Sequence, residues 1–404
     1  MRPRSNRLAA LKFQIDRLEH RVERIGHAAL GIIVFVLVLG SLMIPAVSAA
    51  ERVNSQSGPI IVETVAEGLN HPWGLAFLPE GGMLVTERDG TIRLVTPEGG
   101  VSAPLAGGPQ TEGWGQGGLL DIVIDPEFET SGRLYFSYAG VDGRRAGTAI
   151  AHARIVRDSN GARLESLTEI FRMNQLSRGT RHFGSRIVFA EDGTLWFTVG
   201  DRGDPDRAQD PNDHAGSVLR IDRDGGIPSD NPFRNIEGAQ PELWSIGHRN
   251  AQGAVRHPET GALWTISHGA RGGDEINIPR PGLNYGWPVI SYGRHYSGFS
   301  IGEGTEKAGL EQPIYYWDPS IAPSGAAFYT GDVFPQWKGN LFVGALKNRL
   351  LSRLTLDGEE VTGEELLLSE LGERIRDVRQ GPDGHIYLLT DSPNGRILRL
   401  SPAS

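Results

Sequence analysis

The sequence predicts an all-β protein, a six-bladed β-propeller, preceded by an N-terminal helix and a transmembrane segment or signal sequence. Two observations predict the propeller. Glycine (54 of 404 residues) and proline (25) are abundant beside 39% hydrophobic residues, which favours many short strands joined by turns. In addition, one strand-turn-strand pattern returns six times along the chain. Cysteine is absent, which excludes disulfides and thiolate metal sites.

Residues 1–27 form a basic segment with seven Lys or Arg and three acidic residues. Its apolar residues follow alternating steps of three and four, which predicts an amphipathic helix. These residues are Leu8, Leu11, Ile15, Leu18, Val22 and Ile25. The helix would either lie on a membrane surface or pair with a second copy.

Residues 28–50 carry no charge and are long enough to cross a bilayer, which requires about 20 apolar residues. Basic residues before such a segment predict a cytoplasmic amino end and an exported remainder. Val47-Ser48-Ala49 also resembles a signal-peptidase site, but the long basic segment favours an uncleaved membrane anchor. We expect a periplasmic or extracytoplasmic protein, anchored to the inner membrane or released after cleavage.

Charge argues against nucleic acid as a partner. The chain has 40 Lys and Arg against 49 Asp and Glu, a net charge of −9. The basic head makes the remainder still more acidic, whereas phosphate binding requires a basic surface.

After a linker at 51–59, residues 60–404 repeat one unit: an apolar strand, a turn containing Pro, Asp or Gly, and a strand rich in β-branched and aromatic residues. The six copies begin at Gly74, Leu119, Ser185, Gly253, Gly325 and Ile375. Asp-Gly turns such as 192–193 and 383–384 favour tight hairpins. Such repeats predict four-stranded propeller blades. A β-sandwich, the competing layout, does not explain so regular a return.

The segment Ile60–Val65 belongs to none of the six copies. We expect it to close the ring by pairing with the last blade near Ile397–Leu400. Long insertions at 202–214 and 288–312 should crowd one face of the ring, where loops commonly build ligand sites.

The stretch 243–288 is the richest in chemistry. Arg249 offers a rigid fork of donors and Asn250 an adjacent amide, which together suit an anionic ligand. The glycine-rich run 269–273 can turn backbone carbonyls towards a cation, and Glu275 and Tyr285 add further hard oxygen atoms. Each piece also has an ordinary explanation as a loop corner, a hairpin turn or a salt-bridged carboxylate.

Further polar residues lie where the repeats open or join. Gln116 precedes the second copy, His182 precedes the third, Lys347 follows the second strand of the fifth, and Arg374 and Arg376 bracket the start of the sixth. Ring closure could gather them at one end of the channel. Several cations gathered there, on an acidic protein, predict a pocket for a multiply anionic small molecule.

The residues resemble a known family, the soluble pyrroloquinoline quinone (PQQ) sugar dehydrogenases of the glucose/sorbosone type, most closely the bacterial periplasmic aldose sugar dehydrogenases. The resemblance runs from about Val62 to Pro402. The motifs that carry it are HPWGLAFLP, GQGGLLD, RHFGSRIVF, GHRNAQG, GARGGDEIN, LNYGWP, FPQWKGNLFVGALK and RIRDVRQGPDG.

This resemblance implies a six-bladed propeller that oxidises aldose sugars at C1 to the lactone and passes electrons to an external acceptor. It implies that His182 is the general base, oriented by Asp201, while hydride passes to PQQ. The residues implied to bind PQQ are Gln116, Arg249, Asn250, Tyr296, Lys347, Arg374 and Arg376.

The resemblance also implies Ca²⁺ sites. The carbonyls of Gly269 and Ala270 would bind the ion that touches PQQ, and Glu275 and Tyr285 would form a second, more structural position. The chain departs from the family pattern in having Ala270 where relatives have proline. It also has Arg181 before His182, a cation expected to lower the pKa of the imidazole.

Two other functions stay open at this point. A lactonase-type hydrolase would need several acidic side chains around one channel metal, whereas this sequence predicts converging basic ones. A non-catalytic binding propeller would not require His182 and Lys347 to share a pocket.

Overall fold

The computed structural model describes residues 50–111, 113, 115–159 and 161–403. The predicted basic helix and nearly all of the predicted membrane segment lie outside these residues. Within the described part of the chain, no helix is both long and apolar enough to cross a bilayer.

Six antiparallel sheets form the blades of a propeller, as predicted. The first blade contains β3 (Pro72–Phe77), β4 (Met83–Glu87) and β5 (Ile92–Val95). The second contains β6 (Leu119–Ile124), β7 (Arg133–Asp142), β8 (Arg145–Asp158) and β9 (Gly161–Arg172). The third contains β10 (Ile187–Phe189), β11 (Leu195–Val199), β12 (Ser217–Ile221) and β13 (Leu243–Ser245).

The fourth blade contains β14 (Ala251–Arg256), β15 (Leu263–Ser267), β16 (Asp274–Asn277) and β17 (Tyr315–Trp317). The fifth contains β18 (Pro323–Phe328), β19 (Leu341–Ala345), β20 (Leu350–Asp357) and β21 (Glu360–Leu367). The sixth contains β22 (Ile375–Gln380), β23 (Ile386–Thr390) and β24 (Gly395–Pro402), extended by β2 (Ile60–Leu69) and β1 (Glu51–Val53).

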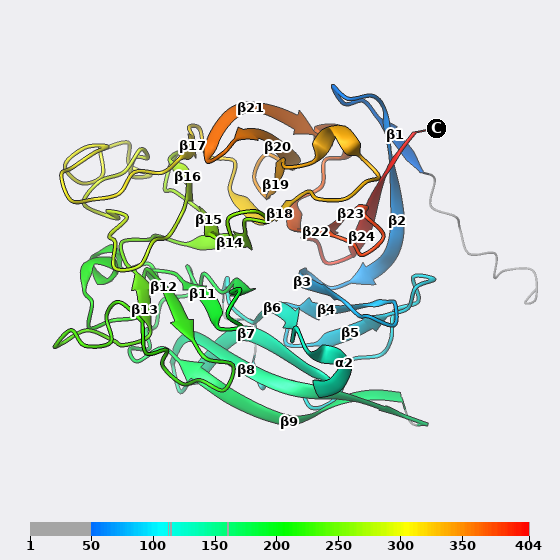
Figure 1. Cartoon of the computed structure of the whole chain (residues 1–404), viewed down its shortest axis with the longest axis horizontal. Coiled ribbons are helices and arrows are strands. Elements are labelled where there is room, and N and C mark those ends of the chain that lie inside the picture. Colours follow the sequence, from blue (N-terminus) through cyan, green and yellow to red (C-terminus); the bar gives the residue numbers. More distant parts are fainter. Residues whose placement is uncertain (1–49, 112, 114, 160, 404) are drawn as a thin grey trace, which may run out of the picture. The chain divides into compact units, whose positions relative to one another are not determined.

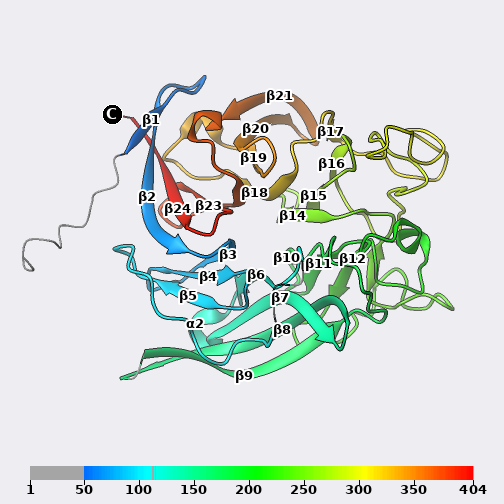
Figure 2. The same ribbon diagram turned by 180° about the vertical axis from the view of Figure 1, so that it is seen from behind.

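In the described part of the chain, helix is confined to short turns between strands. They are α2 (Phe128–Ser131) and the 3₁₀ turns η1 (Pro205–Gln209), η2 (Pro335–Trp337) and η3 (Ser369–Leu371). The first strands of neighbouring blades contact one another around the ring, from β3 through β6, β10, β14, β18 and β22 back to β3. Figures 1 and 2 show these strands towards the centre and the later strands of each blade outside.

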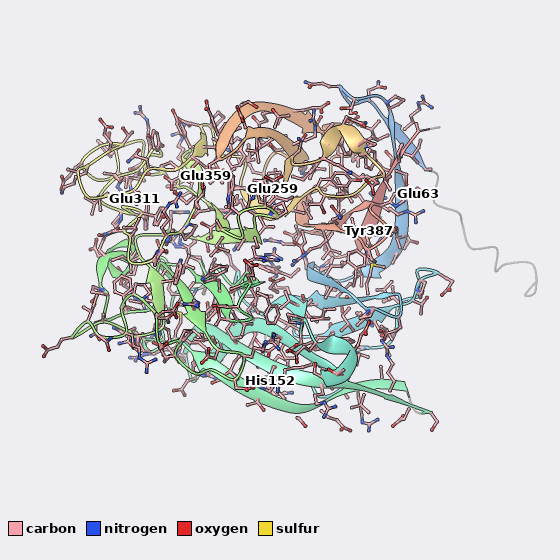
Figure 3. All side chains as sticks on the ribbon, in the orientation of Figure 1. Glu63, His152, Glu259, Glu311, Glu359 and Tyr387 are labelled. Atoms are coloured by element: carbon pink, nitrogen blue, oxygen red, sulfur yellow. The ribbon has the colours of Figure 1, made fainter. Side chains whose placement is uncertain are left out.

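The predicted closure of the ring is confirmed. Strand β2 pairs antiparallel with β24, where Val62 lies opposite Leu400 and Ala66 opposite Ile397. An ion pair reinforces this seam, because Arg399 Nη2 donates to Glu63 Oε2 at 2.8 Å, and Figure 3 labels Glu63 on β2. The first and last parts of the propeller are therefore held in one sheet.

The segment predicted as a linker, 51–59, differs from that expectation because it includes β1. Strand β1 pairs with β2, with Val53 opposite Ile60. Val53 is buried against the core between the fifth and sixth blades, so apolar burial holds this strand in the sheet.

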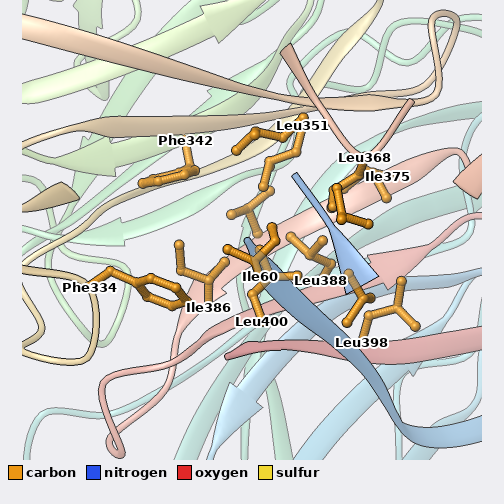
Figure 4. Close-up of a cluster of buried hydrophobic side chains, with 14 of the residues drawn as sticks. Ile60, Phe334, Phe342, Leu351, Leu368, Ile375, Ile386, Leu388, Leu398 and Leu400 are labelled. Carbon is orange, nitrogen blue, oxygen red and sulfur yellow. The ribbon is translucent and has the colours of Figure 1, made fainter. Parts of the chain in front are cut away.

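The blades are stacked through apolar cores between their faces. The cluster between the fifth and sixth blades combines Phe342 and Leu351 with Ile386, Leu388 and Leu400 (Figure 4). Because each sheet is covered on both faces by neighbouring sheets, residues of both alternating sets are buried in strands such as β19 and β23.

A buried ion-pair network ties the inner strands together near the axis. Arg186 Nη1 lies 2.9 Å from Asp121 Oδ1 and 3.0 Å from Asp377 Oδ1. Arg379 contacts the same two carboxylates, at 2.8 and 2.9 Å. Paired charges satisfy one another where water is excluded, so the network links the second, third and sixth blades.

Strand order fixes which residues meet at one end of the ring. In each blade the first strand begins where the second strand ends, because they are antiparallel: Ile375 lies opposite Thr390, and Ala251 opposite Ser267. Residues just before a first strand and just after a second strand therefore share one end. This end carries the candidate site.

Candidate active site

His182 lies in the loop before β10, and Asp201 follows β11 in the same blade. His182 is buried, with 7% of the residue's surface exposed, and its Nδ1 lies 2.6 Å from Asp201 Oδ1. A carboxylate can only accept this hydrogen bond, so Nδ1 carries the proton and Nε2 of the neutral ring has a free lone pair.

Asp201 is held by three donors. Its Oδ1 also accepts from the Gly203 backbone N–H at 2.7 Å, and its Oδ2 accepts from Trp287 Nε1 at 2.9 Å. Burial alone would raise the pKa of Asp201, but the hydrogen bond from His182 and the neighbouring cations hold that pKa below its ordinary value. The carboxylate therefore stays ionised and fixes the orientation of the imidazole.

The backbone of His182 has a left-handed conformation, with φ of 57°, which costs energy in a residue other than glycine. Gln116 stabilises it, since its Oε1 accepts from the His182 N–H at 2.8 Å. Arg202 also stabilises the backbone around His182. Its guanidinium donates to the carbonyls of Arg181, His182 and Gly179 and lies 3.4 Å over the Phe183 ring.

Burial lowers the pKa of His182, and the charges of Arg249 and Arg181 act in the same direction, against the raising effect of Asp201. The expectation that Arg181 lowers this pKa is confirmed. The imidazole is consequently neutral at pH 7 and can accept a proton.

Arg249 and Asn250 lie beside the histidine, at the start of β14. The Asn250 side-chain carbonyl accepts from Gly184 N–H at 3.0 Å, and the Arg249 backbone carbonyl accepts from Asp201 N–H at 2.9 Å. The Arg249 guanidinium lies 5.3 Å over Trp287 and donates to the carbonyls of His268 (3.0 Å) and Gly269.

The predicted cation-binding turn at Gly269 is tightly packed backbone. A Cβ at this position would lie 2.2 Å from the carbonyl oxygens of Gly272 and Gly273, so only glycine fits. Its N–H donates to the buried Asp274 carboxylate at 2.8 Å. A turn rich in closely packed carbonyls fits a hard cation such as Ca²⁺. Arg249 also uses the Gly269 carbonyl, so the guanidinium and a cation would compete for it.

Among the described residues, no hydrogen bond joins Glu275 to Tyr285. The Tyr285 hydroxyl donates to Ile278 O at 2.5 Å and accepts from Arg280 N–H at 2.9 Å. These bonds leave the phenol little capacity for a metal ion. Burial, helped by the nearby Asp274, raises the pKa of Glu275 to about 7, which fits a carboxylate that a cation would stabilise.

Arg374 and Arg376 converge on Asp391, which follows β23. Asp391 Oδ2 accepts from Arg374 Nη2 at 2.9 Å and from Arg376 Nη2 at 3.0 Å, while Oδ1 lies 3.0 Å from His71 Nδ1. Arg376 also donates to Gln252 Oε1 at 2.7 Å. One carboxylate thus positions two cations at the same end of the channel as His182.

Lys347 follows β19. With Arg249, Arg374 and Arg376 it forms what we call the basic group. Its Nζ donates to the Ser320 carbonyl at 3.1 Å, and Arg374 Nη1 donates to the adjacent Leu346 carbonyl at 3.0 Å. Tyr296 lies in the 288–312 insertion, near Arg249, with 75% of its surface exposed. All seven predicted cofactor-binding residues are therefore found at one end of the ring or in the loop above it.

The basic group keeps unused donors. Arg249 and Arg376 each retain a buried Nε without a hydrogen-bond partner in the described structure. Buried donors of this kind usually have a partner, so an anionic group arriving at this end would satisfy them. The donor set therefore fits a small molecule with several carboxylates, such as PQQ.

Sequence reasoning missed Asp391, Trp287, Arg202 and His71 as members of this site. A signal for Asp391 was available: it ends the second strand of the sixth repeat as Asp201 ends that of the third, in the segments YLLTD and FTVGD. Trp287 and Arg202 lie in loops outside the repeated strands, where no such equivalence exists.

A propeller with an Asp-oriented imidazole beside buried arginines defines a catalytic β-propeller with an anion-binding channel end. The glucose/sorbosone dehydrogenase family profile matches residues 69–399. The aldose sugar dehydrogenase YliI of Escherichia coli is 44% identical over 365 residues, 89% of this chain and 98% of that protein. The chain therefore belongs to the glucose/sorbosone dehydrogenase family and is an oxidoreductase that acts on sugars.

Solved structures of similar proteins support this family assignment. The apo-form of the soluble aldose sugar dehydrogenase of Escherichia coli superposes with a TM-score of 0.82 at 44% identity, covering 85% of this chain and all of that one. The PQQ-bound aldose sugar dehydrogenase of Streptomyces coelicolor gives 0.70 at 29% identity, covering 85% and 98%. Family membership argues against both alternatives, the lactonase-type hydrolase and the non-catalytic propeller.

Proposed function

We propose that this protein oxidises aldose sugars at C1 to the lactone, with PQQ as hydride acceptor and Ca²⁺ beside it, and passes the electrons to an external acceptor. The observation that carries the proposal is the neutral imidazole of His182, held by the ionised Asp201, beside the half-buried Arg249 and the buried Arg376. The PQQ-bound relative supports the choice of cofactor.

His182 is the general base in this proposal. Its Nε2 takes the proton of the C1 hydroxyl, and the Asp201 carboxylate then stabilises the imidazolium that forms. The low pKa of His182 keeps the ring in the accepting form at neutral pH. Gln116 and Arg202 support the strained backbone that aims the ring.

PQQ would be held by the basic group. Arg249, Lys347, Arg374 and Arg376 would pair with its carboxylates and quinone oxygens, and Gln116, Asn250 and Tyr296 would add further contacts. When bound, the quinone supplies a carbonyl that accepts hydride. The cations of this chain stabilise the negative charge that develops there.

The first Ca²⁺ position is assigned to the carbonyls of Gly269 and Ala270. Arg249 would release the Gly269 carbonyl to the ion and turn its guanidinium to an anionic ligand. At the second position only Glu275 is proposed as a ligand, because the Tyr285 hydroxyl is already bound by two backbone groups.

The direct test uses the propeller produced without PQQ. PQQ and Ca²⁺ are added, PQQ binding is followed by its absorbance, and bleaching of an artificial electron acceptor is followed with a panel of aldoses. We expect sugar-dependent bleaching that needs both additions. The His182→Ala variant should bind PQQ but lose turnover, and His385→Ala, in a turn at the other end of the sixth blade, should behave as wild type. Absence of PQQ binding and of sugar-dependent bleaching would refute the proposal.

We also propose an extracytoplasmic location, because the basic residues 1–27 precede the uncharged segment 28–50. A fusion reporter that is active only after export, joined behind residue 60, tests it.

A further inference from the structure

A cavity of about 560 Å³ lies beside the glycine turn, and its lining is strongly basic. Arg271, Arg294 and Lys347 contribute three cations, and Asp318 contributes one carboxylate. Lys347 spends one of its three donors on the Ser320 carbonyl, which leaves two. The cavity therefore carries a net positive charge and several free donors.

Arg271 and Arg294 are held opposite each other by the backbone. They form an isolated antiparallel bridge, in which Arg271 N–H donates to Arg294 O at 2.9 Å and Arg294 N–H donates back at 3.2 Å. Directly opposed residues place their side chains on the same side of the ladder, about 4.5–5.5 Å apart at Cβ, where like charges destabilise the pair.

The Asp318 carboxylate lines the same cavity but makes no ion pair with either guanidinium in the described structure. Neither guanidinium makes an ion pair or a side-chain hydrogen bond with any residue among those described, whereas Arg374 and Arg376 share Asp391. Two guanidinium groups without an acidic partner, held side by side, are suited to one carboxylate or phosphate group, which can accept hydrogen bonds from both.

The cavity adjoins the proposed active site and contains only one of the four cations proposed to hold PQQ. Lys347 belongs to both, and Gly272, in its wall, packs against Gly269. Arg249, Arg374 and Arg376 do not line it. A sugar whose C1 faces His182 could thus extend a charged substituent into this space.

We propose that Arg271 and Arg294 form an anion subsite that selects acidic aldoses, those bearing a carboxylate, as in uronic acids, or a phosphate ester. The inference rests on the proposed sugar oxidation and names its substrate class. The pair acts on substrate binding and leaves the cofactor and the proton transfer at His182 unchanged.

The test compares wild type with the double variant R271Q/R294Q, loaded with PQQ and Ca²⁺, on glucose, glucuronate and glucose 6-phosphate. We expect wild type to prefer an acidic sugar. The double variant should raise KM for that sugar roughly tenfold or more, because charge-assisted hydrogen bonds are lost, and change glucose less than about twofold. Loss confined to glucuronate or to glucose 6-phosphate supports the subsite and identifies its anion.

A matched control is R144Q/R145Q, which removes two exposed arginines from the β7–β8 hairpin. Calorimetry with the PQQ-free protein gives an independent readout: glucuronate or glucose 6-phosphate should bind wild type and the control, and bind R271Q/R294Q at least tenfold more weakly. Added salt should weaken this binding.

Three results would overturn the subsite: equal kcat/KM of wild type for neutral and acidic sugars, equal losses for glucose and acidic sugars in R271Q/R294Q, or reduced PQQ affinity in that variant. If no aldose is oxidised but calorimetry still shows arginine-dependent binding of an acidic sugar, the proposed oxidation fails and the anion subsite stands.

Discussion

The Nδ1 atom of His182 lies 2.6 Å from Oδ1 of Asp201, and the other carboxylate oxygen is fixed by Trp287 Nε1 at 2.9 Å. The acid that orients the imidazole is therefore itself oriented by an indole from the loop between β16 and β17 of the next blade. This chain of contacts sets the tautomer, the direction of Nε2 and the charge beside it.

Replacing Asp201 with Asn should keep the shape of the site but remove the charge and disturb the tautomer. We expect kcat to fall by roughly 10²- to 10⁴-fold, because the imidazolium loses its counter-charge. PQQ affinity, followed by absorbance titration, should change little. The control is Asp206→Asn, an exposed acid in η1. A variant with wild-type kcat would contradict the role of Asp201.

The pH dependence should follow the ionisation of His182. The base works only when neutral, so kcat/KM falls as pH drops through the pKa of His182, and the lowered pKa extends activity to lower pH. Arg181→Gln removes one of the charges that lower this pKa, so the acid limb should move to higher pH.

The shift should be small, because Arg181 is exposed and salt screens its charge. Profiles of kcat/KM against pH at low and high ionic strength measure it. Movement of the acid limb to lower pH, or no movement at low salt, would show that Arg181 does not act on the base.

Replacing Asp391 with Asn should leave Arg374 and Arg376 without their shared counter-charge. Removing one partner from a buried ion pair costs about 3–5 kcal/mol, and the partial exposure of Arg374 reduces this figure here. We expect a lower Tm without PQQ and a larger rise in Tm on adding PQQ than in wild type, because cofactor carboxylates would replace the lost charge.

Thermal unfolding with and without PQQ tests this prediction. Asp332→Asn, which removes an exposed partner of Lys338, is the control. Equal PQQ-induced rises in Tm for wild type and Asp391→Asn would indicate that the two arginines do not bind the cofactor.

Replacing Arg202 with Met should loosen the loop that carries His182. The variant keeps contact with Phe183 but loses the hydrogen bonds to the backbone carbonyls of Gly179 and His182. We expect kcat to fall roughly tenfold and the free energy of unfolding to fall by about 1–3 kcal/mol, because the Gly179 carbonyl is left without its donor and the His182 carbonyl keeps only the backbone N–H of residue 202. Kinetics and denaturant unfolding measure the two effects, and Arg202→Lys should recover part of both. Wild-type kcat in Arg202→Met would show that this contact does not position the base.

The local sequence pattern was sufficient to predict the propeller architecture. Alternating apolar residues around Pro, Asp and Gly turns specify hairpins from neighbouring residues alone, and six such units specify six blades. Ring closure could be predicted because the segment Ile60–Val65 belongs to none of the six repeats. In the structure, β2 pairs with β24 as expected. The gathering of His182, Arg249, Lys347 and Arg376 followed from their equivalent places in the repeats.

The partners of these side chains could not be predicted in the same way. Trp287 reaches Asp201 across 86 positions, and His71 reaches Asp391 across 320, through contacts that exist only when the ring is closed and the insertions are packed. The Tyr285 hydroxyl was expected at a cation but is occupied by Ile278 O and Arg280 N, backbone groups whose positions no spacing rule gives.

By itself, then, the sequence determined the strands, their number and the end of the ring where chemistry gathers, because these depend on periodicity and repeat position. Only the tertiary structure decided which carboxylate holds which cation and which nitrogen of His182 is free. It also decided that Arg271 and Arg294 lie opposite each other, with no acidic partner among the described residues. Those outcomes depend on distances of a few ångströms between segments far apart in the chain, and side-chain packing sets such distances.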